Sequence, residues 1–258
     1  GSVDASGTLG GGSIRIGGGQ QGGEGLLRAA NSTLGASATL NADATQSGNG
    51  GSVVVWGDQS STIAGSLSAR GGTLGGNGGA IETSAAHVSI ADSARVNTLA
   101  ANGTNGDWLI DPKDFKIAAS GGDITGATLG TNLGSGNVTI LSSSGSGGGS
   151  GNINVNDTVS WGANTLTLTA AKDVNINAVL TGTGTSALVL NSATANGADA
   201  AVAGGAIKIG KNITTGGNQT YNGPVVLGAN VTLASSGSGT INFISKVDGG
   251  HTLSVNAG

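Results

Sequence analysis

Four short phrases between residues 153 and 190 decide the fold: Ile153-Asn154-Val155, Leu166-Thr167-Leu168, Val174-Asn175-Ile176 and Leu188-Val189-Leu190. Each places apolar side chains at its first and third positions. This period of two is typical of a β-strand with one face in a core and the other in water. Phrases of the same kind follow at Ile207-Lys208-Ile209, Val231-Thr232-Leu233 and Leu253-Ser254-Val255.

The spacing of these phrases predicts the architecture. Leu168, Leu188 and Ile207 are 20 and 19 residues apart, and Thr220 and Thr240 are 20 apart. A lone unit of this length cannot bury its apolar face, whereas stacked units share one continuous core. We therefore predict an all-β protein: a right-handed parallel β-helix (a solenoid) with about twenty residues per coil and almost no α-helix.

This architecture also predicts which side chains face the core. Val174, Ile176 and Leu180 point inward and stack on equivalent residues of the neighbouring coils. Asparagine side chains on the solvent face can hydrogen-bond along the stack. We expect this of Asn152, Asn154, Asn156, Asn175 and Asn177.

The first half of the chain repeats a glycine-rich phrase instead. Gly50-Gly51-Ser52-Val53 is echoed by Gly11-Gly12-Ser13-Ile14 and by Gly78-Gly79-Ala80-Ile81, and because 28 residues separate Gly50 from Gly78, some coils must carry loops. We expect irregular coils over 1–141, a Gly/Ser segment at 142–151 that is a loop rather than a flexible linker, and degenerate repeats over 152–258. These parts would form one continuous rod, a fragment of a longer chain.

Composition excludes several classes. Glycine supplies 52 of 258 residues without a three-residue period, which excludes collagen, and the lack of cysteine excludes disulfide frameworks. The net charge is −4 and the ten Lys and Arg are scattered, so no basic stripe for nucleic acid is present. No apolar run approaches the ~18 residues of a membrane span. A β-sandwich or barrel is the competing fold, but six aromatic residues make a thin core for it.

An acidic cluster is the one constellation that suggests catalysis: Asp107, Asp111, Asp114 and Asp123. Enzymes that cleave glycosidic bonds use paired carboxylates, and some are parallel β-helices. No basic partner set lies at coil spacing, so we predict no enzyme and no catalytic residue. Asp107 and Asp111 are expected to shape turns around Trp108 and Pro112.

No metal or cofactor site is expected. His87 and His251 are isolated in the sequence and lack the context of a catalytic or metal site. The glycine runs at 71–72 and 75–79 lack the aspartates of calcium-binding glycine-rich repeats.

Exposed aromatic rings with polar neighbours often form sugar platforms. Trp56 has the opposite parity to Val53 and Val55, so we expect it to face outward beside Asp58 and Gln59. These three residues, Trp56, Asp58 and Gln59, are the candidate glycan contact. Trp161 shares the parity of inward residues and is expected in the core, while Trp108 and Tyr221 are left open.

Four ordered segments point to a family: Gly50–Asp58, Ile63–Gly72, Gly76–Ser84 and Asn105–Pro112. Together they resemble the region downstream of the secretion domain in filamentous-haemagglutinin-like and high-molecular-weight adhesins of the two-partner secretion type. The tail, with Tyr221–Val225 and Val247–Leu253, is similar to the degenerate repeats of the same proteins. The resemblance covers roughly residues 10–115 and 150–258. The Asn-Pro-Asn motifs of the secretion domain do not occur, which places the chain outside that domain.

The resemblance implies a secreted β-helical fibre at the bacterial cell surface, exported through an outer-membrane translocator. Relatives act as adhesins that bind host or matrix glycans or exopolysaccharide. Two other functions stay open: a self-assembling structural filament of the extracellular matrix, and a carbohydrate-active enzyme. We also expect head-to-tail self-association, because open strand edges and low charge favour pairing between copies, and neither nucleic-acid binding nor membrane insertion.

Overall fold

The structure, a computed structural model, describes residues 1–143, 149–193 and 204–258. Its regular elements are almost all strands that pair in parallel, and they form stacked coils. The predicted all-β parallel β-helix is therefore confirmed. The chain divides into two compact units, one of residues 1–112 with 135–139 and one of residues 113–134 with 140–258. Residues 144–148 of the expected Gly/Ser loop lie outside the described residues.

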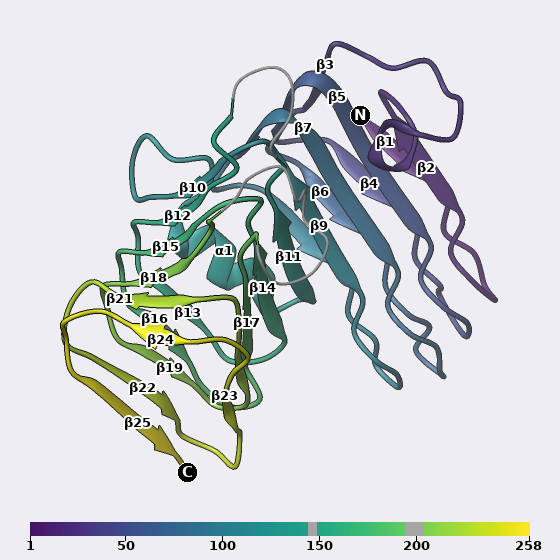
Figure 1. The fold of residues 1–258 in the computed structure, drawn as a ribbon. Coiled ribbons are helices and arrows are strands. Elements are labelled where there is room, and N and C mark those ends of the chain that lie inside the picture. Colours follow the sequence, from purple (N-terminus) through teal and green to yellow (C-terminus); the bar gives the residue numbers. More distant parts are fainter. Residues whose placement is uncertain (144–148, 194–203) are drawn as a thin grey trace. The chain divides into compact units, whose positions relative to one another are not determined.

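The first unit contains two parallel sheets, one of short strands and one that includes the two longest strands, β5 and β7 (Figure 1). The short strands are β1 (Ser2–Asp4), β4 (Thr39–Asn41), β6 (Ser66–Ser68) and β8 (Arg95–Asn97). They pair in the order β1-β4-β6-β8. The second sheet runs β2-β5-β7-β9, and β3 pairs with the later part of β5. Its strands are β2 (Ser13–Ile16), β3 (Asn31–Leu34), β5 (Ser52–Ile63), β7 (Ala80–Ile90) and β9 (Asp107–Asp111).

Coils of the first unit are longer than the twenty residues expected. Thr39 pairs with Ser66 and Ser66 with Arg95, spacings of 27 and 29 residues. The extra residues form four long turns, here called the arms (residues 5–12, 42–51, 69–79 and 98–106), which lead from the short strands to β2, β5, β7 and β9 (Figure 1). Neighbouring arms hydrogen-bond to one another, as in Gly48 N–H to Gly75 O at 2.8 Å.

The repeated Gly-Gly pair marks where the arms enter the sheet. A Cβ on Gly51 would lie 1.9 Å from the carbonyl oxygen of Gly12, and one on Gly79 would lie 2.0 Å from that of Gly51. The backbones of successive coils thus approach too closely for any side chain. Close backbone approach is a general reason for glycine, and here it explains the phrase that the sequence repeats.

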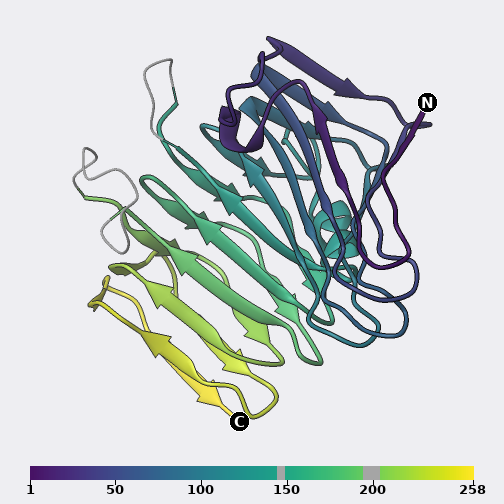
Figure 2. The same ribbon diagram turned by 90° about the vertical axis from the view of Figure 1, so that its right-hand side faces the viewer.

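The second unit has three strands per coil (Figure 2). Ile153 pairs with Val174 and Val225 with Val247, spacings of 21 and 22 that agree with the expected twenty-residue coil. Phe115 pairs with Ile153 and Val174 with Ile207, spacings of 38 and 33, so two coils of this unit are longer. One sheet holds β10 (Phe115–Ile117), β12 (Ile153–Val155), β15 (Val174–Ile176), β18 (Ile207–Ile209), β21 (Val225–Leu227) and β24 (Val247–Asp248). A second holds β13 (Val159–Trp161), β16 (Leu180–Gly182), β19 (Ile213–Thr215), β22 (Val231–Ser235) and β25 (Leu253–Ala257). The third side has β14 (Thr165–Thr169), β17 (Ala187–Asn191), β20 (Gln219–Asn222) and β23 (Ile241–Phe243), and β11 (Asn137–Leu141) has residues in both units.

The expected residue-by-residue matching was wrong in detail. Leu188 pairs with Leu166 and not with Leu168, and Ile207 pairs with Val174 in a different sheet. Thr220 pairs with Asn242, two residues beyond Thr240. Each coil contains three similar phrases, so successive coils can be aligned in several ways with nearly equal spacing. The sequence therefore indicates the length of a coil but not which residues pair.

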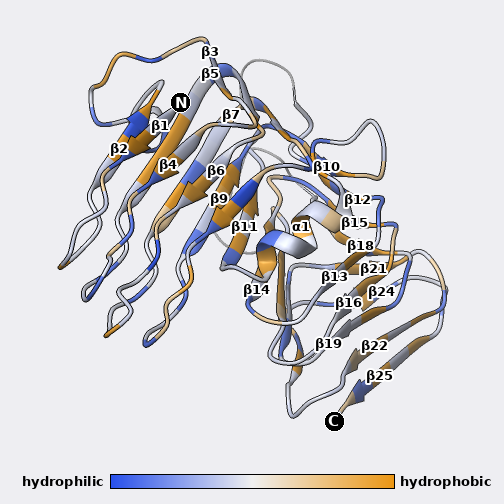
Figure 3. Ribbon diagram, turned by 180° about the vertical axis from the view of Figure 1, so that it is seen from behind, coloured by the Kyte–Doolittle hydropathy of each residue, from blue (hydrophilic) through white to orange (hydrophobic). Residues whose placement is uncertain are grey.

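The predicted inward register is confirmed in the second unit. Val174, Ile176 and Leu180 are fully buried, and the alternation of apolar and polar residues is visible along the strands (Figure 3). The outward asparagines form the expected ladder. Asn175 Nδ2 donates to Asn154 Oδ1 at 2.9 Å, and Asn177 Nδ2 donates to Asn156 Oδ1 at 2.8 Å.

One short helix was not expected from the sequence. The α-helix α1 (Gly126–Leu133) packs against β13, with Leu129 and Leu133 buried. Thr125 caps its N-terminus by accepting the Thr128 N–H at 3.2 Å. Within the described ranges, no helix has the length and hydropathy needed to cross a membrane.

Candidate functional site

A loop here called the strap (residues 17–29) lies on the outer face of the β2-β5-β7-β9 sheet. It leads from β2 to β3 and is the purple segment that arches between them (Figure 1). It contains a 3-10 turn, η1 (Gln20–Gly22), whose Gln21 N–H donates to Glu82 Oε1 at 2.9 Å. Ion pairs of Arg15 with Glu24 (2.9 Å) and of Arg28 with Asp58 (3.3 Å) attach the middle and the C-terminal end of the strap. Each ion pair joins one residue of the strap to one residue of the sheet, so charged groups hold the strap on the sheet.

Trp56 faces outward, as its parity predicted, and the strap covers part of its ring. A Cβ on Gly22 would lie 2.6 Å from the indole Cζ2, and the positive φ of Gly22 (68°) also favours glycine. The indole Nε1 donates to Asp58 Oδ1 at 2.9 Å, and Gln59 follows in an exposed position. The structure thus brings Trp56 and Asp58 together beside the strap, and Gln59 is their exposed neighbour in sequence.

A pocket of about 280 Å³ lies between the strap and the sheet. Val54 and Leu109 form an apolar floor, and its polar lining comes from Arg15, Gln20, Ser52, Glu82 and Asp107. A small apolar hollow with a few converging polar groups is the usual form of a small-molecule site.

Four polar residues of this pocket were not predicted as site residues from the sequence: Arg15, Gln20, Ser52 and Glu82. A signal for two of them existed. Arg15, Val54 and Glu82 each stand three residues after the second glycine of a Gly-Gly phrase, and the strand register places them in one row. Gln20 carried no such signal, since it belongs to the strap.

Glu82 is the unusual group of the pocket. It is only 4% exposed, and its Oε2 has no hydrogen-bond partner among the described residues. Burial raises the pKa of Glu82 above its ordinary value. Burial, with a smaller contribution from the negative charge of Glu82, also raises the pKa of Asp111 to about 6. This face of the sheet therefore carries acids that bind protons more readily than free carboxylates.

The four aspartates of the expected cluster have different surroundings. Asp107 and Asp111 begin and end strand β9, so the expectation that they shape turns was wrong. Asp114 accepts the backbone N–H groups of Ser150 (2.9 Å) and Asn152 (2.8 Å). Asp123 accepts the N–H of Lys116 at 2.7 Å. Asp114 and Asp123 thus tie loops to the second unit.

The other two tryptophans and the tyrosine lie in the core. Trp161 is 4% exposed, as its parity predicted. Trp108 is also buried and donates its Nε1–H to Thr83 Oγ1 at 3.0 Å. Tyr221 donates to Gln219 Oε1 at 2.6 Å and stacks on Phe243. His87 and His251 are both exposed, and the described part of the chain has no group of three or more side chains placed to hold a metal ion.

Comparison with known proteins adds no relative to this description. A scan against protein-family models gives no match. A search of curated protein sequences gives no match either. The residues of the candidate site therefore carry the structural evidence on function.

Proposed function

We propose that this chain is part of a secreted bacterial surface adhesin that binds glycans through the outer face of its first unit. The observation that carries the proposal is the pocket beneath the strap, where Oε2 of the buried Glu82 carboxyl makes no hydrogen bond of normal geometry to a described residue, although the Ser84 hydroxyl interacts with this carboxyl and lowers its pKa. A buried polar atom without a partner is unfavourable, and a sugar hydroxyl is a donor that would complete it.

The lining of the pocket suits a sugar ring. The C–H groups of a pyranose can pack on Val54 and Leu109, while Arg15, Gln20 and Asp107 surround that floor with donors and acceptors. At about 280 Å³, the pocket is near the lower limit of ~300–1,000 Å³ for ligand sites. It therefore fits a small group, such as one residue of a longer glycan.

A longer glycan would continue along the sheet. Trp56 lies against the strap and Asp58 is paired with Arg28 of the strap, and the part of the indole left uncovered provides a second apolar contact. The proposal thus keeps Trp56, Asp58 and Gln59 as a contact and adds the pocket to them. Following the resemblance, it also includes export through an outer-membrane translocator and display at the cell surface.

A glycan-array screen of the purified chain, followed by titration of the best ligand, tests this function. Glu82→Gln keeps an acceptor for Gln21 N–H but removes the carboxylate, and Gln59→Ala removes the exposed amide that follows Asp58. We expect tenfold weaker binding for Glu82→Gln and a smaller loss for Gln59→Ala. Asp248→Asn is the matched control, because it makes the same carboxylate-to-amide change at an exposed site of the second unit.

Two outcomes would contradict the proposal. One is a screen in which no glycan binds the wild-type chain. The other is a ligand whose affinity is the same for wild type, Glu82→Gln and Gln59→Ala, since the binding surface would then lie elsewhere.

A further inference from the structure

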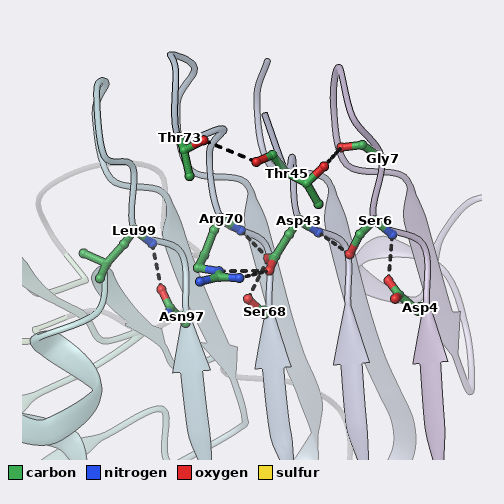
Figure 4. A network of polar contacts seen from close by, with 10 residues as sticks. All are labelled: Asp4, Ser6, Gly7, Asp43, Thr45, Ser68, Arg70, Thr73, Asn97 and Leu99. Carbon is green, nitrogen blue, oxygen red and sulfur yellow. Dashed lines mark hydrogen bonds and ion pairs between the residues drawn. The ribbon is translucent and has the colours of Figure 1, made fainter. Parts of the chain in front are cut away.

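A second polar site lies at the base of the arms in the first unit (Figure 4). Its centre is Asp43, which is 6% exposed. The Asp43 carboxylate accepts from Ser68 Oγ at 2.6 Å and from Arg70 N at 2.7 Å, both through Oδ1. Its Oδ2 accepts the Arg70 guanidinium through Nε (2.9 Å) and Nη2 (2.7 Å). A buried, fully bonded carboxylate thus fixes the guanidinium of Arg70 in one orientation.

Arg70 is held but not buried. Its side chain is 54% exposed, against 8% for Asp43. Within the described residues Asp43 is the one ion-pair partner of Arg70, and it contacts Nε and Nη2. The two N–H groups of Nη1 are therefore left to donate to a ligand, at no loss of the contacts that orient the side chain.

A hollow of about 360 Å³ opens beside this guanidinium. Figure 4 shows Asp43 on one side of Arg70, with Asn97 and Leu99 of the next coil on the other. Asn97 Oδ1 accepts the Leu99 N–H at 3.0 Å, which leaves its Nδ2 as a donor. Leu99, Ala100 and Ala101 supply an apolar wall, and Thr45 and Thr73 supply hydroxyl groups.

We propose that this hollow binds a sugar that carries a carboxylate. Guanidinium N–H groups bind carboxylates in a planar, charge-assisted geometry. The Asn97 amide provides a further donor, the hydroxyl groups of Thr45 and Thr73 match sugar hydroxyls, and the apolar wall matches the C–H face of a pyranose. A neutral sugar would offer Nη1 only uncharged acceptors and would lose the charge-assisted part of this contact.

The chemistry of this site differs from that of the pocket beneath the strap. The lining of the strap pocket contains two carboxylates, Glu82 and Asp107, whereas the lining of the hollow beside Arg70 contains none. It should therefore disfavour an acidic sugar. The Arg70 site does not depend on the function proposed above, and variants at the two places separate them.

The test is a calorimetric titration of the chain with an oligomer of galacturonic acid and, separately, with the methyl ester of that oligomer. The ester keeps the sugar rings and removes the charge. We expect the acid form to bind at least tenfold more tightly, and this preference to decrease as the NaCl concentration rises. The double variant Asp43→Asn/Arg70→Gln should bind the acid form at least tenfold more weakly, and Glu82→Gln should bind it like wild type.

The double variant is chosen because Arg70→Gln alone would leave the buried charge of Asp43 unpaired. If its melting temperature falls, Asn97→Leu gives the same test, since it alters the opposite wall and leaves the ion pair intact. Equal affinity for acid and ester, no binding of either, or wild-type affinity in a folded variant would overturn the proposal. Loss of binding in Glu82→Gln alone would move the acidic sugar to the strap pocket and would also overturn it.

Discussion

Val174→Asp should be one of the most damaging single substitutions in the second unit. Val174 is fully buried on β15, and its strand neighbours in the adjacent coils are Ile153 and Ile207. The side chains of both neighbours are aliphatic, so neither can hydrogen-bond to a carboxylate. The substitution therefore places an acid in a purely apolar stack.

The magnitude follows from two terms. Loss of the buried valine costs about 1.5–2 kcal/mol. At pH 7 an aspartate with an unfolded pKa near 3.9 must either stay charged in the core or take up a proton, and protonation costs ~4 kcal/mol at ~1.36 kcal/mol per pH unit. The sum of about 6 kcal/mol is comparable to the whole stability of many domains, ~5–15 kcal/mol.

Asn175→Asp is the matched comparison one residue away. It loses the donor to Asn154 Oδ1 on a half-exposed face, which should cost about 1 kcal/mol. Val174→Asn supplies a second control, because it has the shape of the aspartate without its charge. Urea unfolding followed by circular dichroism measures all three.

The pH dependence separates the two terms. In Val174→Asp the folded-state pKa is raised above the unfolded one, so the protonation term is full at pH 7 and disappears as the pH falls to about 4. Val174→Asp should then become nearly as stable as Val174→Asn. Equal stability of Val174→Asp and Asn175→Asp at pH 7, or a Val174→Asp deficit that does not change with pH, would refute the inward register.

Three further predictions concern stability. The pKa of Asp111 is about 6 in the folded state against an ordinary 3.8, so its ionisation destabilises the fold, with a cost that develops between about pH 4 and pH 6 and is complete above pH 6. The wild-type free energy of unfolding should therefore rise by about 1 kcal/mol between pH 7 and pH 5, and by about 3 kcal/mol once the pH is below 4. Asp111→Asn should remove that rise. Asp114→Asn should instead lower the free energy of unfolding by ~1–2 kcal/mol at neutral pH, because it weakens the acceptors for two backbone N–H groups. Both Asp111→Asn and Asp114→Asn should keep wild-type glycan binding. A depolymerising activity that either variant loses would show that the chain is an enzyme. Gly51→Ala should destabilise the fold by ~2–3 kcal/mol, because its Cβ would lie 1.9 Å from the Gly12 carbonyl oxygen. Gly35→Ala is the control and should be near neutral, because the space around Gly35 is open. Equal melting temperatures of the two variants would contradict the close backbone approach.

The fold could be predicted because each coil repeats one local rule. Alternation at Val174-Asn175-Ile176 indicates the strand, its inward face and its outward asparagines without knowledge of the partners. The partners depend on how many residues each turn consumes, and turns do not follow the alternation. Helix α1 was missed for a related reason: its residues Gly126–Leu133 contain two glycines and three threonine or asparagine residues, which favour loops, and packing against β13 overrides that preference.

The candidate site could be predicted only in part. Parity placed Trp56 outward beside Asp58, because both lie on one strand. The hydrogen bond between Gln21 and Glu82 joins two segments that are 61 residues apart in the sequence. This contact places the strap over Trp56 and forms the pocket beside Glu82. Arg70 and Asp43 meet across 27 residues in the same way. A linear sequence indicates which residues share a strand, but not which loop folds onto that strand.

The parallel pairing of each coil with its immediate neighbours has a consequence for how the chain acquires its structure. In the second unit a strand needs a partner only about one coil away, such as Val174 for Ile153. Such pairings have a short sequence separation, and an array of this kind can nucleate in one place and grow by addition of one coil at a time. A chain that leaves a narrow pore end first could therefore fold as it emerges. Each coil that docks onto the growing end would then oppose backward sliding, so that folding itself would supply direction to the passage.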